Sequence, residues 1–282
     1  MESLNQKVVY LKWLKSIGIE YYFSEKKDSN ISSIRNLIAI SNNLERKTKD
    51  KDKDKKKYSI DKVNHICPSI NSDINLNSTI YNARILANTA NSIEKLKSVI
   101  MDFNGCDLKN FSRNTVFADG NPEAEIMLVG EAPGVKEDES GIPFCGESGE
   151  LLDKMLSTIN LSRKKNVYIT NTIFWRPPAN RRPTKHEIEI CLPFVEKHIA
   201  LKKPKLIICI GSTAVAGLLG QKISINAAKS ISHFYQNIYL SKPINTMAIY
   251  HPAYLLRQPS KKKDTWFDLI KIQQFLEEKI LV

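Results

Sequence analysis

The spacing of apolar residues changes several times along the chain, and each change predicts a different kind of element. Between residues 80 and 102, apolar residues recur at every third or fourth position, which predicts an amphipathic helix. Farther along, apolar runs of six or seven residues alternate with stretches of helical spacing. These patterns predict strands at 125–130, 166–171, 205–211 and 245–251, and helices at 147–159, 184–201, 212–219 and 263–280.

The alternation of strands with helices indicates how these elements assemble. Parallel strands joined by helices form a sheet that is buried on both faces, so its strands are almost continuously apolar. We therefore predict an α/β fold: a three-layer α/β/α sandwich around a mostly parallel four-stranded central sheet. Thr184 supports one helix boundary, because Glu187 follows three residues later in the pattern of a capping box.

The first 80 residues have a different pattern. Residues 1–25 place four apolar residues on one stripe and are predicted to form an N-terminal helix. Residues 26–80 are rich in Ser, Asn, Lys and Asp with little apolar periodicity, and we expect a disordered basic and polar linker. The folded domain is then predicted to span residues 81–282.

The formal charge of +12 gives a sequence pI of about 9.3. Residues 46–57 hold eight Lys or Arg and three Asp, so a net charge of +7 remains on the rest of the chain. That excess fits a polyanionic partner such as nucleic acid, and solubility alone would explain it equally well. The lysine run itself is interpreted as a solvated tether, with nonspecific contact to DNA phosphates as the alternative.

The cysteines and the apolar runs exclude other classes of protein. Five cysteines are present, at positions 67, 106, 145, 191 and 209, with no CxxC pair and no cluster suited to zinc. No apolar run approaches the length of a membrane span, and the first residues do not resemble a signal peptide. We expect a cytoplasmic protein without a disulfide framework.

Polar and glycine residues follow each of the four predicted strands. The first strand is followed by 130–134, the second ends at Asn171, the third is followed by Ser212 and the fourth ends at His251. In an open α/β sheet, ligands bind at the carboxyl ends of the strands, so these residues are expected to converge. Each taken alone would also suit an ordinary turn or a satisfied structural residue. Neither dinucleotide nor P-loop spacing occurs.

Two basic loops are expected at the same edge of the sheet. The first, 176–184, places Arg176, Arg181 and Arg182 among prolines, and arginine suits phosphate contacts through its planar fork. In the second, Leu255 and Leu256 stand beside Arg257. Leucines next to a basic loop suit wedging into a base stack, and a core role for both is the alternative.

Three blocks carry a resemblance to a known family. They are GEAPGVKEDESGIPFCGESGELLDKML at 130–156, YITNTIFWRPPANRRPTKHEIEICLPFV at 168–195 and YHPAYLLR at 250–257. In this order they resemble the family 4 uracil-DNA glycosylases, from about Cys106 to the C-terminus. The resemblance implies the uracil-DNA glycosylase fold for residues 81–282, and DNA containing uracil as the partner.

The resemblance also implies roles for individual residues. Glu131, Ala132 and Pro133 match the loop along the uracil. Phe144 matches the aromatic residue on which the base stacks, and Asn171 matches the amide that reads the base edge. His251 matches the histidine beside uracil O2, and Glu137 matches an acidic residue close to the reacting sugar. The implied catalytic residues are Glu131, Glu137 and His251.

The chemistry of uracil release suits these side chains. An Asn side chain can donate to O4 and accept from N3–H, and cytosine offers the reversed pattern. A donor at His251 would stabilise the negative charge that develops on the leaving base. Either Glu131 or Glu137 would stabilise the cationic sugar or orient the attacking water. Family 1 enzymes have an aspartate where this chain has Ala132, so their activation of water does not transfer.

One departure from the family concerns its four-iron cluster. Cys106 and Cys191 match two of the four cluster cysteines, whereas Phe103 and Trp175 stand at the other two positions. Because neither Phe nor Trp can ligate iron, we predict that the cluster is absent and that aromatic packing replaces it. Ligands recruited from Cys67 or Cys145 are the alternative.

These observations together predict a monomeric DNA-repair glycosylase that hydrolyses the N-glycosidic bond of deoxyuridine and leaves an abasic site. One alternative is a protein that binds or traps uracil in DNA with little turnover. The trapping relatives carry an added histidine in a basic insertion, and 257–263, RQPSKKK, has none. The other alternative is a nonspecific DNA-binding scaffold.

Overall fold

The computed structural model describes residues 69–279. The predicted N-terminal helix 1–25 and most of the predicted linker 26–80 lie outside these residues. Within the described part, α3 (Ser69–Thr89) already begins at Ser69, so the expectation of a linker up to residue 80 is wrong at its end.

A six-stranded sheet, ordered β1-β3-β2-β4-β6-β5, is the centre of the described region. The four inner strands are parallel and match the predicted ones: β3 (Val167–Asn171), β2 (Ile126–Gly130), β4 (Leu206–Ile210) and β6 (Ile244–Ile249). Two short antiparallel strands at the edges, β1 (Asp119–Gly120) and β5 (His233–Tyr235), were not predicted.

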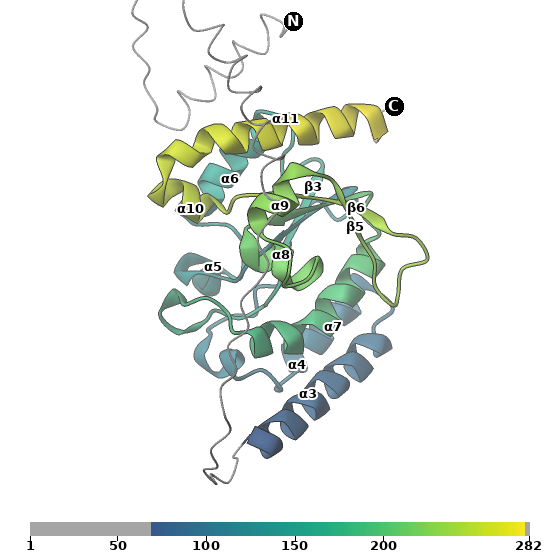
Figure 1. Cartoon of the computed structure of the whole chain (residues 1–282). Helices are drawn as coiled ribbons and strands as arrows, with labels where there is room; N and C mark the ends of the chain where they lie inside the picture. Colours follow the sequence, from purple (N-terminus) through teal and green to yellow (C-terminus); the bar gives the residue numbers. More distant parts are fainter. Residues whose placement is uncertain (1–68, 280–282) are drawn as a thin grey trace, which may run out of the picture. The chain divides into compact units, whose positions relative to one another are not determined.

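Helices cover both faces of the sheet, as the prediction of three layers requires. In Figure 1, α6 (Glu147–Ser157), α10 (Pro252–Arg257) and α11 (Lys262–Lys279) lie on one side. On the other side lie α3, α4 (Ile93–Asp102) and α7 (Lys185–Lys202). The remaining helices are α5 (Val135–Ser140), α8 (Ser212–Leu218) and α9 (Ile225–Ser230), with 3-10 turns at Asp107–Phe111, Pro178–Asn180 and Pro259–Lys261.

The core follows from the alternation of side chains along the buried strands. Met127, Val129 and Ile207 form one apolar cluster with residues of α4 and α7. Their neighbours Leu128 and Ile208 point to the other face and are also fully buried. Because β2, β3 and β4 are buried at every position, their sequences can be apolar on both faces of the sheet.

The helix predicted at 80–102 is in fact two helices. Ser92 begins the second one, because its side chain accepts a hydrogen bond from the backbone N–H of Lys95. The first helix packs on α7, where Arg84 pairs with Glu196 at 2.7 Å and Ala83 is buried. This packing, rather than a local apolar pattern, accounts for a helix that extends into the Ser- and Asn-rich segment.

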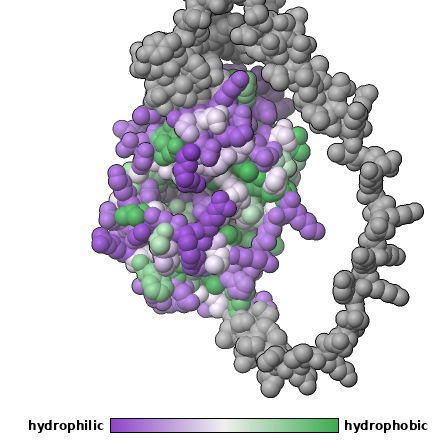
Figure 2. Space-filling view, turned by 60° about the vertical axis from the view of Figure 1, so that its left-hand side comes forward, coloured by the Kyte–Doolittle hydropathy of each residue, from purple (hydrophilic) through white to green (hydrophobic). Residues whose placement is uncertain are grey.

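Most large apolar side chains of the described region are buried, and a few, such as Phe111 and Ile238, are exposed. The face shown in Figure 2 is mainly hydrophilic, with small and separated apolar patches. Among residues 69–279, none of the helices is long and apolar enough to cross a membrane.

Candidate active site

A cavity of about 980 Å³ opens at the carboxyl edge of the parallel strands. The strand registers align this edge, since Gly130 of β2 stands opposite Asn171 of β3 and Ile210 of β4 opposite Ile249 of β6. The residues predicted for the site that line the cavity are Glu131, Ala132, Pro133, Glu137, Phe144, Arg181, Arg182, His251 and Arg257. Residues that follow β2, β4 and β6 thus meet at one cavity, whereas Asn171 at the end of β3 is not part of its lining.

Glu131 directly follows β2 and is held from two sides. Its Oε2 atom accepts a hydrogen bond from the hydroxyl of Thr213 in the first turn of α8. Its backbone carbonyl accepts another, at 2.6 Å, from the hydroxyl of Thr172 just after β3. The Oε1 atom accepts no hydrogen bond from a residue in 69–279, so the carboxylate keeps one oxygen available to a ligand. The two threonines were not singled out, although Thr172 directly follows β3 and Thr213 comes three residues after the end of β4.

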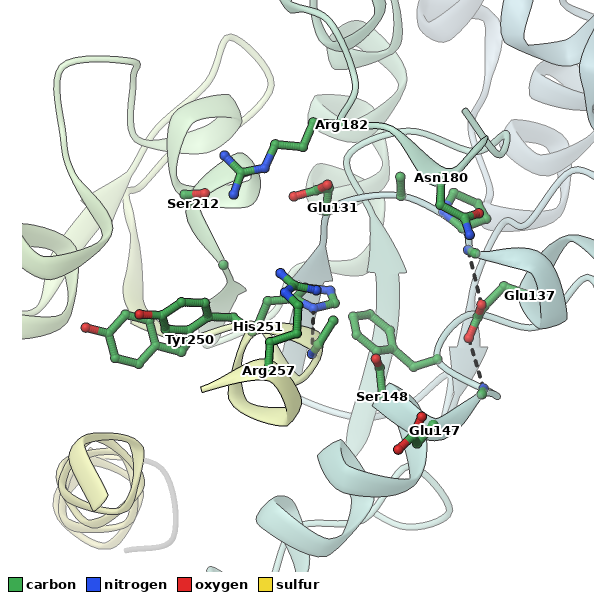
Figure 3. A pocket seen from close by; sticks show the side chains of 18 of the residues that line it. Glu131, Glu137, Glu147, Ser148, Asn180, Arg182, Ser212, Tyr250, His251 and Arg257 are labelled. Atoms are coloured by element: carbon green, nitrogen blue, oxygen red, sulfur yellow. Dashed lines mark hydrogen bonds between the residues drawn. The ribbon is translucent and has the colours of Figure 1, made fainter. Parts of the chain in front are cut away.

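Glu137 has both carboxylate oxygens bonded to the backbone. Oε2 accepts from the N–H of Gly134 at 3.1 Å, and Oε1 accepts from the N–H groups of Cys145 and Gly146, each at 3.0 Å. Figure 3 shows Glu137 on one wall of the cavity, with its bonds to other lining residues as dashed lines. The side chain therefore ties the loop after β2 to the loop that carries Phe144.

Phe144 has a left-handed backbone, with φ of 53°, and its side chain is buried. Its ring packs against the residue at the end of β2, since a Cβ added to Gly130 would lie 2.6 Å from the ring. On the other side, the ring centroid lies 5.5 Å from that of His251. Glycine at position 130 is what allows the ring to approach the sheet so closely.

Arg163 supports the loop of Phe144 from behind. Its guanidinium donates to the carbonyl oxygens of Pro143 at 3.1 Å and Phe144 at 2.8 Å. The same group forms ion pairs with Asp119 at 2.8 Å and Asp153 at 3.0 Å. Because these anchors belong to β1 and α6, the loop is fixed to the sheet and to a helix at once.

Asn171 ends β3 and is only 1% exposed. Its Oδ1 atom is buried and has no hydrogen-bond partner in the described part of the chain. A Cβ added to Gly130 would meet both this oxygen and the ring of Phe144, so the amide and the ring both lie against this glycine; of the two, only Phe144 lines the cavity. Burial of an unsatisfied acceptor is costly, and a ligand N–H at this point would offset that cost.

His251 begins α10 at the end of β6. Its Nδ1 atom accepts a hydrogen bond from the backbone N–H of Ala253 at 3.2 Å. Burial lowers the pKa of its imidazole, the charge of Arg257 lowers it further, and the carboxylates of Glu131 and Glu137 oppose the shift. The ring is therefore neutral near pH 7, and its proton resides on Nε2, which is left as the donor.

A comparison with family models matches residues 117–272 to the uracil DNA glycosylase superfamily, by the description of that model. The chain belongs to this superfamily. The match covers the four inner strands and the residues that follow them, and it leaves out α3 and α4. It confirms the predicted α/β/α fold and the resemblance stated from the three sequence blocks.

Individual relatives agree with this assignment. The type-4 uracil-DNA glycosylase of Archaeoglobus fulgidus is 36% identical over 192 residues, which are 67% of this chain and 95% of the relative. That of Sulfurisphaera tokodaii is 36% identical over 187 residues, or 65% of this chain and 84% of the relative. A type-5 uracil-DNA glycosylase of Thermus thermophilus is 32% identical over 114 residues, 36% of this chain and 52% of the relative.

The arginines of the loop 176–184, which were predicted to bind DNA, differ in their contacts with the rest of the protein. Arg181 forms a two-pronged pair with Glu187, at 2.6 and 2.9 Å, and Arg176 donates to Asn180 at 2.7 Å and lies outside the cavity lining. Arg182 lies beside Glu131 in Figure 3. Arg182 is therefore the best placed of the three to reach a phosphate near the cavity.

The prediction of a DNA wedge is wrong for Leu255, which is fully buried in α10. Its side chain packs in the interior of the domain and is not part of the cavity lining. Leu256 is half-buried and stays a prediction. Of the alternatives left open, the core role is therefore correct for the first leucine.

The residues at the four family cluster positions do not fit an iron–sulfur cluster. The ring of Phe103 lies 6.5 Å from that of Trp175 and 4.9 Å from that of Phe194, measured between centroids. Cys106 and Cys191 are buried and hydrogen-bond to each other, which lowers the pKa of the first thiol and raises that of the second. Within residues 69–279, no group of three or more potential ligands is suited to a metal ion.

Proposed function

We propose that this chain is a DNA-repair glycosylase that hydrolyses the N-glycosidic bond of deoxyuridine in DNA, releases uracil and leaves an abasic site. The observation that carries the proposal is the buried, unpartnered Oδ1 of Asn171 beside the ring of Phe144. An acceptor next to an aromatic ring that lines a cavity is what a base with an N3–H group requires. The named activity of the relatives supports the same assignment.

Recognition of the base follows from these two side chains. Extrusion of uracil from the stack costs a few kcal/mol, and stacking on Phe144 returns about 1–3 kcal/mol. The Oδ1 atom of Asn171 accepts from N3–H while the amide nitrogen donates to O4. Cytosine has no proton on N3 and an amino group at position 4, so both contacts with it would fail in a buried site.

Bond cleavage is assigned to His251 and Glu131. As the glycosidic bond breaks, electrons move to the base, and the Nε2–H of neutral His251 donates to the oxygen at position 2 of the leaving uracil. The sugar becomes cationic, and the carboxylate of Glu131, with its free Oε1, stabilises it and orients the attacking water. Glu137 is assigned a positioning role, because both of its oxygens bind the backbone.

The domain, partner and cofactor assignments follow. We place the glycosylase domain in residues 81–282, preceded by the N-terminal part of α3. Every side chain in the scheme comes from one copy of the chain, so a monomer acting on uracil-containing DNA is sufficient. No step requires an iron–sulfur cluster, and we propose that this chain folds and acts without one.

One assay tests the proposal against its rivals. Full-length protein is incubated with excess oligonucleotide that contains a single uracil, and alkali then cleaves any abasic sites. Strand cleavage at uracil over many turnovers is expected. A stable protein–DNA adduct without turnover would identify a trapping protein. Binding that is equal with uracil and thymine, with no cleavage, would identify a nonspecific DNA-binding scaffold.

A further inference from the structure

The cavity continues beyond the residues assigned to uracil. Past His251 its lining is formed by residues of α9 and α10, by Tyr250 directly after β6, and by Lys261. Figure 3 shows Tyr250 on the side of His251 that lies away from Glu137 and Glu147. A single base at Phe144 and Asn171 leaves this second end of the cavity, which we call the tyrosine end, without an occupant.

Two tyrosines in contact with each other form the tyrosine end, and one of them is fixed. The Tyr250 hydroxyl donates to Asn226 Oδ1 at 2.6 Å. The ammonium group of Lys229 lies 3.1 Å from the centre of the same ring and is itself paired with Asp268 at 2.9 Å. With its hydroxyl and one face occupied, Tyr250 is buried and serves as a support.

Tyr254 packs on this support and lines the cavity. The two ring centroids are 5.2 Å apart with planes tilted by 50°. In contrast to Tyr250, the ring is only half-buried, so part of it is presented to the cavity. A braced and partly exposed aromatic ring is the type of surface on which proteins stack an unpaired base.

Arg257 supplies a cation next to this ring. Tyr254 and Arg257 are three residues apart in α10, so their side chains are neighbours, and both line the cavity. The side chain of Arg257 is exposed and has no hydrogen bond or ion pair with another residue of 69–279, although it contributes to the lining of the cavity. An unpaired guanidinium between two base sites suits the phosphate that joins two nucleotides.

We infer that the tyrosine end binds the nucleotide next to the target uracil, with its base stacked on Tyr254 and the linking phosphate at Arg257. This inference rests on the proposed function and specifies its substrate. A neighbour stacked on the protein has left the stack of its own strand. The substrate is therefore a strand with two consecutive unstacked nucleotides, and single-stranded DNA presents it more readily than a duplex.

Excision kinetics on modified oligonucleotides test the inference. Three single-stranded oligonucleotides with one uracil are compared. The first has all its bases, and the other two have a tetrahydrofuran residue, which lacks a base, directly 5′ or directly 3′ of the uracil. We expect kcat/KM of the wild type to fall about tenfold when the base on one of the two sides is absent. Tyr254→Leu should show the same loss on the intact strand and no further loss when that base is removed. Tyr254→Phe keeps the ring and should behave like the wild type.

Phe234→Leu is the matched control, because Phe234 is 68% exposed on the edge strand β5 and does not line the cavity. It should leave all rates unchanged. Thermal unfolding of each variant checks the fold. A wild type insensitive to both neighbouring bases, or a Tyr254→Leu variant as sensitive as the wild type, would overturn the inference while excision itself persists.

Failure of the proposed function has a different result. In that case no oligonucleotide loses its uracil, and the same strands and variants are compared by fluorescence anisotropy, which needs no turnover. Loss of one neighbouring base should weaken binding by the wild type about tenfold and should not change binding by Tyr254→Leu. That result would support the tyrosine end as a nucleotide site. Equal binding throughout would refute it.

Discussion

The Nδ1 atom of His251 accepts the backbone N–H of Ala253, and this bond assigns the ring proton to Nε2. We expect His251→Ala to reduce the single-turnover rate of uracil release about 100- to 1,000-fold, as loss of an oxyanion donor does elsewhere. DNA affinity should change little. Rapid-quench kinetics and anisotropy measure the two effects. An unchanged chemical rate would refute the assigned role.

The pH dependence of the same step follows from the lowered pKa of His251. The neutral ring is the active form. Its pKa in the folded protein lies below the ordinary value of 6.5. The rate should therefore stay constant as the pH falls through 6.5, and it should decline only at the lower pH at which the buried ring takes up a proton. Single-turnover rates between pH 4.5 and 8 provide the measurement. An inflection at or above pH 6.5 that is absent in His251→Ala would contradict this assignment.

Substitution of Asn171 should affect excision of uracil and stability in opposite directions. Asn171→Leu removes a buried acceptor without a partner, so the free energy of unfolding should stay equal or rise by about 1 kcal/mol. Uracil excision should nevertheless fall by at least 100-fold, because N3–H and O4 lose their partners. Urea denaturation and kcat/KM are the two readouts. A stable variant with normal excision would show that Asn171 does not read the base.

The two carboxylates should respond differently to substitution. Glu137→Ala removes three hydrogen bonds to the backbone, and we expect the free energy of unfolding to fall by about 2–3 kcal/mol. Binding of the base should also weaken, because these bonds hold the loop of Phe144. Glu131→Gln should keep stability within about 0.5 kcal/mol while the chemical rate falls. Thermal unfolding with single-turnover rates separates the effects. The reverse pattern would exchange the two roles.

A buried histidine away from the site should govern acid stability. His198 is fully buried, stacks on Phe117 with centroids 4.4 Å apart and hydrogen-bonds to the Tyr168 hydroxyl. Burial lowers its pKa to about 3 from 6.5. Between these values the unfolded chain binds a proton that the folded chain does not, so stability falls as the pH decreases from 6.5 towards 3.

The test compares denaturation midpoints at pH 7 and pH 4.5. The wild type should lose about 2.5 kcal/mol more than His198→Gln, whose side chain does not titrate and still offers Tyr168 an acceptor. Equal losses in both proteins would mean that His198 does not control the acid transition.

Much of the fold followed from the sequence because the four inner strands are short, mostly apolar and separated by amphipathic helices. The edge strands β1 and β5 did not, since two or three residues carry no periodicity and become strands only by pairing with a neighbour. Helices α5, α9 and α10 have six residues each, less than two turns, so no apolar stripe marks them.

The same contrast holds for the site. Residues at strand ends were predictable, because parallel strands bring their carboxyl ends together. Contacts across loops were not. The bonds from Glu137 to the loop of Phe144, and the burial of Leu255, depend on the path of the chain between elements, which spacing does not encode.

Arg163 has a consequence for timing. It holds the carbonyl of Phe144 against β1 and α6, while Glu137 holds the next two N–H groups from the opposite side. The aromatic ring is thus in position before DNA arrives. The entropic cost of ordering its loop is met during folding and not during binding. The slow movement in each catalytic cycle should then belong to the nucleotide rather than to the protein.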